Sequence, residues 1–345
     1  MVGEPLVIKY GKPKNCGINE QMVSKFPDRS FLGGLIFSSR EFFMENLSSI
    51  YFKYLKRFFL HIIDFFIPSK IVRKNFVSWA TFPKFNLVPN ATRYDKLINV
   101  AFCFNDRYIP LAMTAISSLL KNSPGCKYDI YCVTDITKYS QTKISRYIKE
   151  HYSNGNIIFL KPNKDYDNAY CGRWPHAIWW RCMLPKLLPE SVKRIIYADV
   201  DTLFVRDLRE ANEFEIGTNL LSGCFDSSTY INSGFLVMNI EQFRLENKYP
   251  QMVHWAENNQ TRYPDQDMLN TICLGRIKPM SRKFNIIVDA GYGFLKTMTA
   301  SQYRDIKYPV MLHYAGKTKP WNADIKRFFT FNVYRKYYNA VINNY

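Results

Sequence analysis

Apolar runs alternate with helix-periodic segments along the chain from Leu97 onward. The strand-like runs are "LINVAFCF", "YDIYCVTD", "NIIFLKP" and "KRIIYADVDTLFV", and the helix-like segments between them are "LAMTAISSLLKN", "SQTKISRYIKEHY" and "HAIWWRCMLPKLLP". This alternation predicts an α/β fold whose mixed, mainly parallel sheet is covered by helices on both faces. Ligands bind such sheets beyond the carboxyl ends of the strands, so candidate functional residues are expected there.

The segment that precedes this pattern has a different character. Residues 1–40 are rich in Gly, Pro and Lys, and residues 42–66 hold nine aromatic side chains in 25 positions. As a helix, residues 42–66 would carry an apolar stripe, with Lys53, Lys56 and Arg57 on another face. Two interpretations remain open for this helix: docking onto the rest of the chain, or binding to an anionic membrane surface.

These patterns divide the chain into three regions. We expect a helical N-terminal extension at 1–95, an α/β domain at 96–321 and a basic, aromatic, helical tail at 322–345. The tail, "KRFFTFNVYRKYYNAVINNY", repeats the basic and aromatic composition of residues 42–66. Two such elements favour surface binding somewhat, without excluding packing.

Composition and charge narrow the class of protein. The chain has 345 residues, 47% of them hydrophobic, which is enough for a sizeable core. Its formal net charge of +18 indicates polyanionic surroundings, whether nucleic acid, anionic lipid or phosphorylated glycan. The two ends are disproportionately basic, because Lys and Arg exceed Asp and Glu by 8 in residues 1–96 and by 5 in residues 317–345.

Cysteine usage and hydropathy bear on the compartment. The eight cysteines form no C-x-x-C pair and no zinc-like spacing, so we expect buried, reduced thiols. No signal-peptide pattern is visible, and no stretch approaches the roughly 20 apolar residues of a spanning helix. The expected location is cytoplasmic, either free or held peripherally on the inner face of the cytoplasmic membrane.

Two carboxylates stand where a buried strand ends. Asp199 and Asp201 follow the apolar run "RIIY", and residues two apart on a strand point to the same side. Like charges that close repel unless one is protonated or a cation lies between them. A hard divalent ion, Mn²⁺ or Mg²⁺, would resolve the conflict, whereas a strand ending in a solvated acidic turn is the structural alternative.

Further motifs carry a family resemblance. "AFCFNDRY" precedes the acidic pair, and "YINSGFLVMNI", "YPDQDMLN" and "HYAGKTKPW" follow it in that order. Together they resemble the bacterial lipopolysaccharide glucosyl- and galactosyltransferases of glycosyltransferase family eight, over about Leu97 to Trp321. The resemblance implies a GT-A (Rossmann-like) fold, a UDP-sugar donor, Mn²⁺, a glycan or glycolipid acceptor, and transfer with retention at the anomeric carbon.

The resemblance also implies residue roles. Asp199, Asp201 and His313 match the metal ligands, a set of oxygens and one imidazole that suits Mn²⁺. Gly316 and Lys319 resemble the family's diphosphate clamp, and Arg181 resembles the arginine that reaches the donor. The positions around the donor sugar, which we group as candidate catalytic residues, are Asp226, Asn232, Asp265 and Gln266.

The first strand departs from the family pattern. An aspartate is common where Asn105 stands, and an asparagine where Arg107 stands, while Tyr108 matches the aromatic residue that stacks on the base. Asn105 can still hydrogen-bond uracil. The exchange keeps UDP as the expected nucleotide.

The route to retention stays open at this stage. A double displacement needs a nucleophile, for which Gln266 is poor and Asp265 stronger; same-face attack by the acceptor hydroxyl, with the departing phosphate taking the proton, is favoured.

The alternative functions are a metal-dependent phosphodiesterase or nuclease and a self-glucosylating, glycogenin-like transferase. We expect UDP-glucose or UDP-galactose as donor, and no nucleic-acid partner. A nicotinamide dehydrogenase is disfavoured because "FCFNDRYIP" lacks the required glycines.

Overall fold

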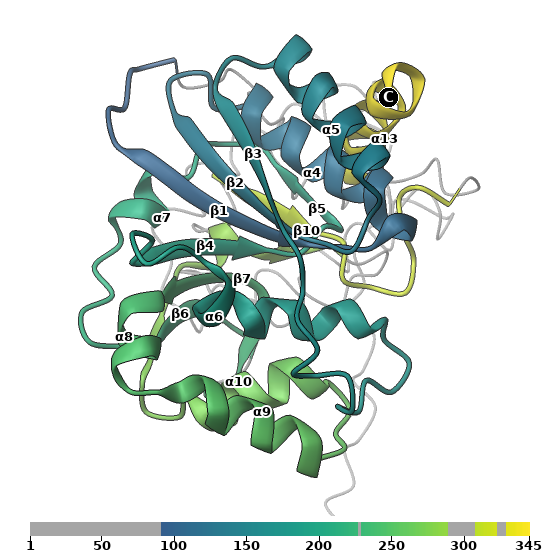
Figure 1. The fold of residues 1–345 in the computed structure, drawn as a ribbon. Coiled ribbons are helices and arrows are strands. Elements are labelled where there is room, and N and C mark those ends of the chain that lie inside the picture. Colours follow the sequence, from purple (N-terminus) through teal and green to yellow (C-terminus); the bar gives the residue numbers. More distant parts are fainter. Residues whose placement is uncertain (1–90, 227–228, 289–307, 323–328) are drawn as a thin grey trace, which may run out of the picture. The chain divides into compact units, whose positions relative to one another are not determined.

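A seven-stranded sheet forms the centre of the structure (Figure 1). The computed structural model describes residues 91–226, 229–288, 308–322 and 329–345. The strands follow the order β3 (Gly155–Leu160), β2 (Lys127–Val133), β1 (Leu97–Cys103), β4 (Arg194–Ala198), β7 (Ile231–Asn239), β6 (Leu221–Phe225) and β8 (Ile277–Pro279). Only β7 runs antiparallel to its neighbours within this sheet. The mixed, mainly parallel sheet expected from the sequence is confirmed.

A second sheet of three strands carries part of the candidate site. It has the order β5 (Thr202–Phe204), β10 (Met311–His313) and β9 (Ile286–Ile287). The expectation of one strand through "KRIIYADVDTLFV" is therefore wrong, since β4 and β5 belong to different sheets. The bend between them is fixed by a hydrogen bond of 2.6 Å from Oγ1 of Thr202 to the carbonyl oxygen of Asp199. Asp and Thr favour such local bonds over strand pairing.

Helices cover both faces of the large sheet (Figure 1). On one face lie α4 (Ile109–Lys121) and α5 (Lys138–His151); on the other lie η3 (His176–Met183), α6 (Leu184–Leu187), α8 (Ile240–Leu245), α9 (Lys248–Asn258) and α10 (Pro264–Ile272). Short helices η2 (Asp106–Tyr108), α7 (Arg209–Glu213) and η4 (Arg282–Phe284) lie in connections. The helix expected over "HAIWWRCMLPKLLP" is instead a 3-10 helix followed by one α turn, with Pro185 in the first turn of α6.

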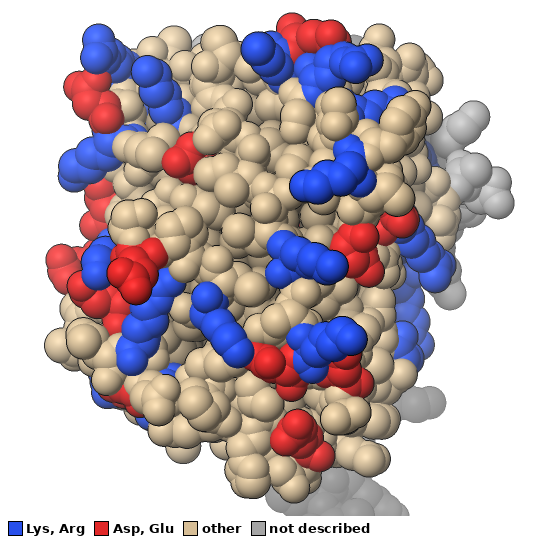
Figure 2. Space-filling view, viewed as in Figure 1, with Lys and Arg blue, Asp and Glu red and all other residues tan. Residues whose placement is uncertain are grey.

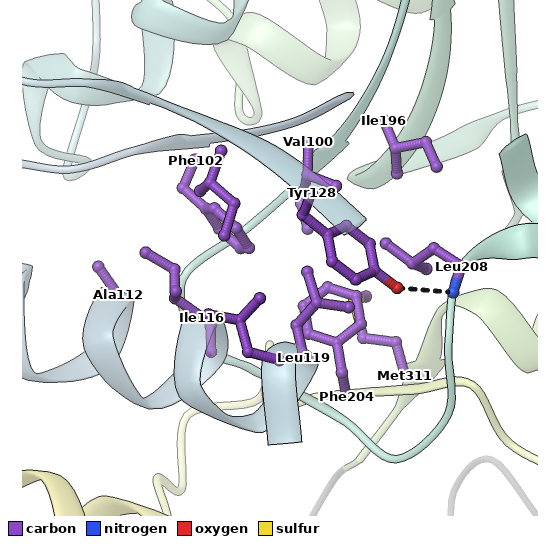
Figure 3. Packing of buried hydrophobic residues seen from close by; sticks show 14 of the residues in the cluster. Val100, Phe102, Ala112, Ile116, Leu119, Tyr128, Ile196, Phe204, Leu208 and Met311 are labelled. Atoms are coloured by element: carbon purple, nitrogen blue, oxygen red, sulfur yellow. Dashed lines mark hydrogen bonds between the residues drawn. The ribbon is translucent and has the colours of Figure 1, made fainter. Parts of the chain in front are cut away.

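Successive side chains of β1 point alternately into two separate hydrophobic cores. Val100 and Phe102 pack with α4 and α5, whereas Ala101 and Cys103 pack with the helices of the opposite face. Figure 3 shows the first core, where Phe102 and Tyr128 meet the α4 side chains. Because the strand side chains are buried on both faces of the sheet, the strands appear in the sequence as continuous apolar runs.

The tail forms helix α13 (Phe329–Asn344), which lies beside α4 (Figure 1). Its buried side chains in the described residues are Thr330, Phe331, Tyr334, Tyr337 and Val341. Asn122, at the end of α4, donates hydrogen bonds to the Tyr337 hydroxyl at 2.9 Å and to the carbonyl oxygen of Phe204 at 2.8 Å. The aromatic side of this helix is thus used in packing. The extension at 1–90, with the proposed helix at 42–66, lies outside the described residues.

Cysteines, hydropathy and surface charge complete the description. The seven cysteines in the described part of the chain form no disulfide, and six of them are buried, as expected for reduced thiols. Among the same residues, no helix has the length and apolar character needed to cross a bilayer. Figure 2 shows acidic and basic side chains interspersed over one face, rather than the continuous basic track typical of nucleic-acid binding.

Candidate metal centre and donor site

The candidate metal ligands meet because the two sheets join beside β4. Asp199 and Asp201 lie in the bend between β4 and β5, and strand pairing sets His313 opposite Thr202, next to Asp201. Nε2 of His313 lies 3.2 Å from Oδ1 of Asp201 and 3.7 Å from Oδ2 of Asp199. One ligand atom from each of the three residues lies within 4.8 Å of the others. The structure therefore brings together the three residues that the motifs predicted.

A chain of amide hydrogen bonds orients the imidazole of His313. The backbone N–H of Gly234 donates to Oδ1 of Asn232 at 3.0 Å, and Nδ2 of Asn285 donates to the same oxygen at 2.8 Å. Oδ1 of Asn285 therefore faces Nδ1 of His313, at 2.9 Å. Because that oxygen can only accept, Nδ1 carries the proton and Nε2 is left to face the two carboxylates. This is the arrangement that a metal-binding histidine requires.

Gly234 permits the close approach of this imidazole. A Cβ atom at Gly234 would lie 2.2 Å from Cε1 and 2.6 Å from Nδ1 of His313. The carbonyl oxygen of Gly234 accepts the backbone N–H of Asp199 at 3.0 Å, so the backbone cannot withdraw without breaking the contact between β4 and β7. A side chain at this position would displace His313 from Asp199 and Asp201.

Arg181 links one metal-ligand candidate to the start of α10. Its Nη2 lies 2.9 Å from Oδ1 of Asp199, and its Nε lies 3.2 Å from Oδ2 of Asp265. Nη1 donates to the carbonyl oxygen of Ser233 at 2.9 Å. Burial raises the pKa of Asp265, and the charge of Arg181 opposes that effect. The guanidinium thus holds two carboxylates from different elements in fixed positions.

Two further contacts complete this part of the site. The Tyr197 hydroxyl donates to Oδ1 of Asp199 at 2.6 Å, and the guanidinium of Arg181 lies 4.6 Å from the centre of the Tyr197 ring. Oε1 of Gln266 accepts the backbone N–H of Ser233 at 2.9 Å. Gln266, on α10, is therefore held against β7 at Ser233, the residue that follows Asn232.

The charges of the cluster favour a divalent cation. Nζ of Lys319 lies 2.8 Å from Oδ2 of Asp201 and donates to the carbonyl oxygen of Tyr314 at 2.6 Å. Burial favours the neutral acid, but His313 and Lys319 outweigh it and hold the pKa of Asp201 well below its usual range. Burial of the imidazole favours its neutral form, but the two aspartates outweigh burial and raise the pKa of His313.

A charge count supports the same conclusion. The three carboxylates of Asp199, Asp201 and Asp265 face two permanent cations, Arg181 and Lys319, so one negative charge is left to be balanced by a proton on His313 or by a bound cation. Two carboxylate oxygens and one imidazole nitrogen form a donor set that suits Mn²⁺, and Mg²⁺ less closely. The residues present therefore fit a divalent ion at this position.

The turn after β1 forms a second part of the candidate site. Because β1 and β4 are parallel neighbours, their carboxyl ends lie at one edge of the sheet, which places Asn105, Arg107 and Tyr108 on the same edge as Asp199. Oδ1 of Asn105 is buried and has no hydrogen-bond partner among the described residues. Arg107 is exposed, and Tyr108 is half-buried. An unpartnered buried acceptor is what a ligand N–H group requires.

Two further predicted residues lie at the margin of the cluster. Asp226 is exposed at the end of β6, yet desolvation of its carboxylate raises its pKa, which Arg282, a hydrogen bond with Asn232 and the charge of His313 oppose. Gly316 lies in the loop between His313 and Lys319. Sequence reasoning missed Asn285, Ser233 and Gly234 as supporting residues. A glycine inside a strand often marks a close approach and could have identified Gly234, whereas Asn285 lies in a short turn outside every motif.

Comparisons with known proteins agree with this geometry. Residues 99–325 match the family model for glycosyl transferase family 8. The chain is 25% identical over 267 residues to a lipopolysaccharide 1,2-glucosyltransferase of Escherichia coli, covering 70% of this chain and 78% of that protein. It is 18% identical over 249 residues to a lipopolysaccharide 1,3-galactosyltransferase of Salmonella typhimurium, covering 65% and 73%.

Solved structures give the fold. The galactosyltransferase LgtC, in complex with donor and acceptor sugar analogs, has a TM-score of 0.58 at 18% identity, covering 70% of this chain and 96% of that chain. The glycosyltransferase GlyE of Streptococcus pneumoniae has a TM-score of 0.56 at 23% identity, covering 72% and 63%. The expected GT-A fold is confirmed. With the family model spanning most of the α/β domain, the chain belongs to glycosyltransferase family 8.

Proposed function

We propose that the chain is a retaining hexosyltransferase, which moves glucose or galactose from a UDP-sugar to a hydroxyl group of a glycan or glycolipid. The observation that carries this proposal is the cluster of Asp199, Asp201 and His313 beside Arg181 and Lys319. The names of the Escherichia coli and Salmonella relatives support lipopolysaccharide or another surface glycan as the acceptor.

The cluster would bind the donor's diphosphate together with a cation. In this proposal Asp199, Asp201 and His313 would hold Mn²⁺, with Mg²⁺ as the alternative, and the ion's positive charge would stabilise the negative charge of departing UDP. Lys319 shares a loop with Gly316, and rotation of its side chain can carry the ammonium from Asp201 to a phosphate oxygen. Asn105, Arg107 and Tyr108 are assigned to the nucleoside, because the orphaned Oδ1 of Asn105 can accept the N3–H of uracil.

The side chains near the donor sugar are suited to positioning. Asp265 is paired with Arg181, and Gln266 accepts the Ser233 N–H group, so neither presents an uncommitted nucleophile. We favour same-face attack: the acceptor oxygen bonds to the anomeric carbon, the bond from that carbon to the UDP oxygen breaks, and the acceptor proton passes to the departing phosphate. Asp226, Asn232 and Asp265 would hold sugar hydroxyls and stabilise positive charge at the anomeric carbon.

A donor screen tests this proposal. Purified protein is incubated with Mn²⁺ and UDP-glucose, UDP-galactose or the UDP-N-acetylhexosamines, and UDP release by slow hydrolysis is measured. We expect UDP release from one hexose donor and its loss in excess EDTA. The rate of UDP release should fall by orders of magnitude in Asp201→Asn. Asp129→Asn, on β2, is the matched control because its carboxylate accepts a hydrogen bond from the exposed Asn156 and lies outside the cluster.

The alternatives have separate readouts in the same experiment. Cleavage of single- or double-stranded DNA or RNA without UDP release would favour the phosphodiesterase. A stepwise increase of one hexose mass in the protein itself would favour the self-glucosylating transferase. Activity of Asp201→Asn equal to that of Asp129→Asn would refute the metal assignment.

The ends of the chain require a proposal of their own. We assign residues 1–95 to an extension that holds the enzyme at an anionic membrane surface, where each basic residue contributes about 1 kcal/mol. Support comes from the basic and aromatic composition of residues 42–66. Salt-sensitive sedimentation with anionic but not neutral vesicles is expected, and Glu at Lys53, Lys56 and Arg57 should weaken it. Absence of binding at low salt would favour docking of that helix onto the catalytic domain.

A further inference from the structure

Four side chains form a surface that the catalytic roles above do not use. We call Arg173, Trp174, Arg262 and Tyr263 the cationic aromatic platform. The Trp174 and Tyr263 ring centroids lie 6.4 Å apart, and Nε1 of Trp174 donates to the carbonyl oxygen of Arg262 at 3.4 Å. Each ring has a guanidinium over one face: Arg173 Cζ lies 4.6 Å from the Trp174 centroid and Arg262 Cζ lies 5.3 Å from the Tyr263 centroid.

The chain places this platform beside the reaction centre. Trp174 lies two residues before η3, the helix that carries Arg181, and Tyr263 lies two residues before Asp265. Arg181 and Asp265 are joined by their ion pair at 3.2 Å. The platform therefore flanks the pair on both of the segments that supply it.

Local backbone geometry supports the position of both arginines. Gly172 has a φ of 57°, in the left-handed region, which turns the chain immediately before Arg173. Tyr263 is the N-cap of α10, and its backbone N–H donates to Oδ2 of Asp267 at 3.0 Å. Both segments are thus held by turn and capping interactions, while both arginines are exposed and both rings are half-buried.

The two guanidinium groups are available to an anion. Arg173 and Arg262 are exposed, and within the described part of the chain neither forms an ion pair with a carboxylate. The Asp267 carboxylate is engaged by the Tyr263 N–H and the Tyr230 hydroxyl, and that of Asp167 lies 4.0 Å from His176. Guanidinium groups present paired N–H donors that match phosphate and carboxylate oxygens.

We propose that the platform is an acceptor subsite for an acidic sugar, one that carries a phosphate or carboxylate group. The apolar C–H face of a pyranose packs against the Trp174 and Tyr263 rings, while Arg173 and Arg262 bind the anionic substituent. Acceptor specificity would then depend on charge as well as on ring shape. This inference rests on the proposed transferase function, because the subsite orients the acceptor hydroxyl toward the donor sugar beside Asp265.

Three glycosides test the subsite directly. Methyl β-glucopyranoside, its 6-phosphate and the corresponding methyl glucuronide are titrated into the full chain at low salt, with UDP and Mg²⁺, and binding is measured by saturation-transfer NMR. The 6-phosphate or the glucuronide should bind at least tenfold more tightly than the neutral glycoside, and the difference should shrink as salt is raised. Which of the two binds better distinguishes phosphate from carboxylate recognition.

Variants decide whether the platform is responsible. Arg173→Gln/Arg262→Gln should remove the preference for acidic glycosides, and Trp174→Ala should weaken all binding. Arg146→Gln, an exposed arginine on α5, is the matched control and should change neither. Equal affinity for all three glycosides, no binding of any of them, or an unchanged preference in the double variant would overturn the proposal. Binding of UDP is measured on the same samples, and its absence in the unmodified chain would count against the transferase assignment alone.

Discussion

Replacing Gly234 by alanine would place a methyl group 2.2 Å from Cε1 and 2.6 Å from Nδ1 of His313. Ordinary contact begins near 3.4 Å, so the imidazole would have to retreat by about 1.2 Å. Overpacking of this kind costs about 1–3 kcal/mol of unfolding free energy. Metal–ligand distances tolerate only about 0.2 Å, so the displaced imidazole should also lower Mn²⁺ affinity by at least about tenfold.

Urea unfolding and titration with Mn²⁺, followed by electron paramagnetic resonance of the free ion, measure the two effects. Gly223→Ala, on neighbouring β6, is the matched control, because its Cβ would meet no atom closer than 3.2 Å: methyl groups of Leu236 at 3.2 Å and Ile231 at 3.4 Å, and the carbonyl oxygen of Phe235 at 3.5 Å. The cost of Gly234→Ala should fall when His313→Ala is also present, since the clash with the imidazole is removed and only the contact with Oδ1 of Asn232, at 2.9 Å, remains. An equal cost in both backgrounds, or unchanged Mn²⁺ affinity in Gly234→Ala, would refute the steric argument.

Three other predictions concern the donor site, the imidazole and the tail. Lys319→Ala should weaken UDP binding in calorimetry, whereas Asp265→Asn should spare it and slow transfer; equal losses of UDP affinity would contradict the separate roles. Asn285→Leu should lower Mn²⁺ affinity by about 10–100-fold, because Nδ1 of His313 loses its acceptor; affinity unchanged in the same titration would exclude an orienting role. Asn122→Ala should lower the free energy of unfolding in urea by about 1–3 kcal/mol, because its hydrogen bonds to Phe204 and Tyr337 are lost. Asn344→Ala, which removes an exposed hydrogen bond on α13, should have little effect. Equal losses of stability in the two variants would show that the buried hydrogen bonds contribute no more than the exposed one.

The sequence predicted the layered fold because burial on both sheet faces imposes apolar runs and helix periodicity that are visible locally. It also grouped Asp199, Asp201 and His313, although only through the motif order. It did not reveal that β4 and β5 separate, since β5 pairs with β10, a strand more than 100 residues away. Long-range pairing of such short strands leaves almost no local pattern.

The supporting residues were hidden for a related reason. Asn285 orients His313 through a chain of hydrogen bonds between side-chain amides that joins η4, β7 and β10. In the sequence, Asn232 and Asn285 each resemble an ordinary turn residue. The tail was ambiguous because a basic, aromatic helix suits a bilayer surface and a protein groove equally well. The contact of Tyr337 with Asn122 shows how its aromatic side is used, and composition could not supply that partner.

The division of the ligand set between two sheets has a thermodynamic consequence. Asp199 directly follows a strand of the large sheet and His313 ends a strand of the small one, so an ion bound to both joins elements that could otherwise open separately. At a hundredfold excess over Kd, such an ion adds about 2.7 kcal/mol to the stability of the joined state. If the amide of Leu312 in β10 exchanges its hydrogen only when the two sheets open, the bound ion should slow that exchange by about a hundredfold. Exchange in α5, which carries no metal ligand, depends on local opening of that helix and should not change.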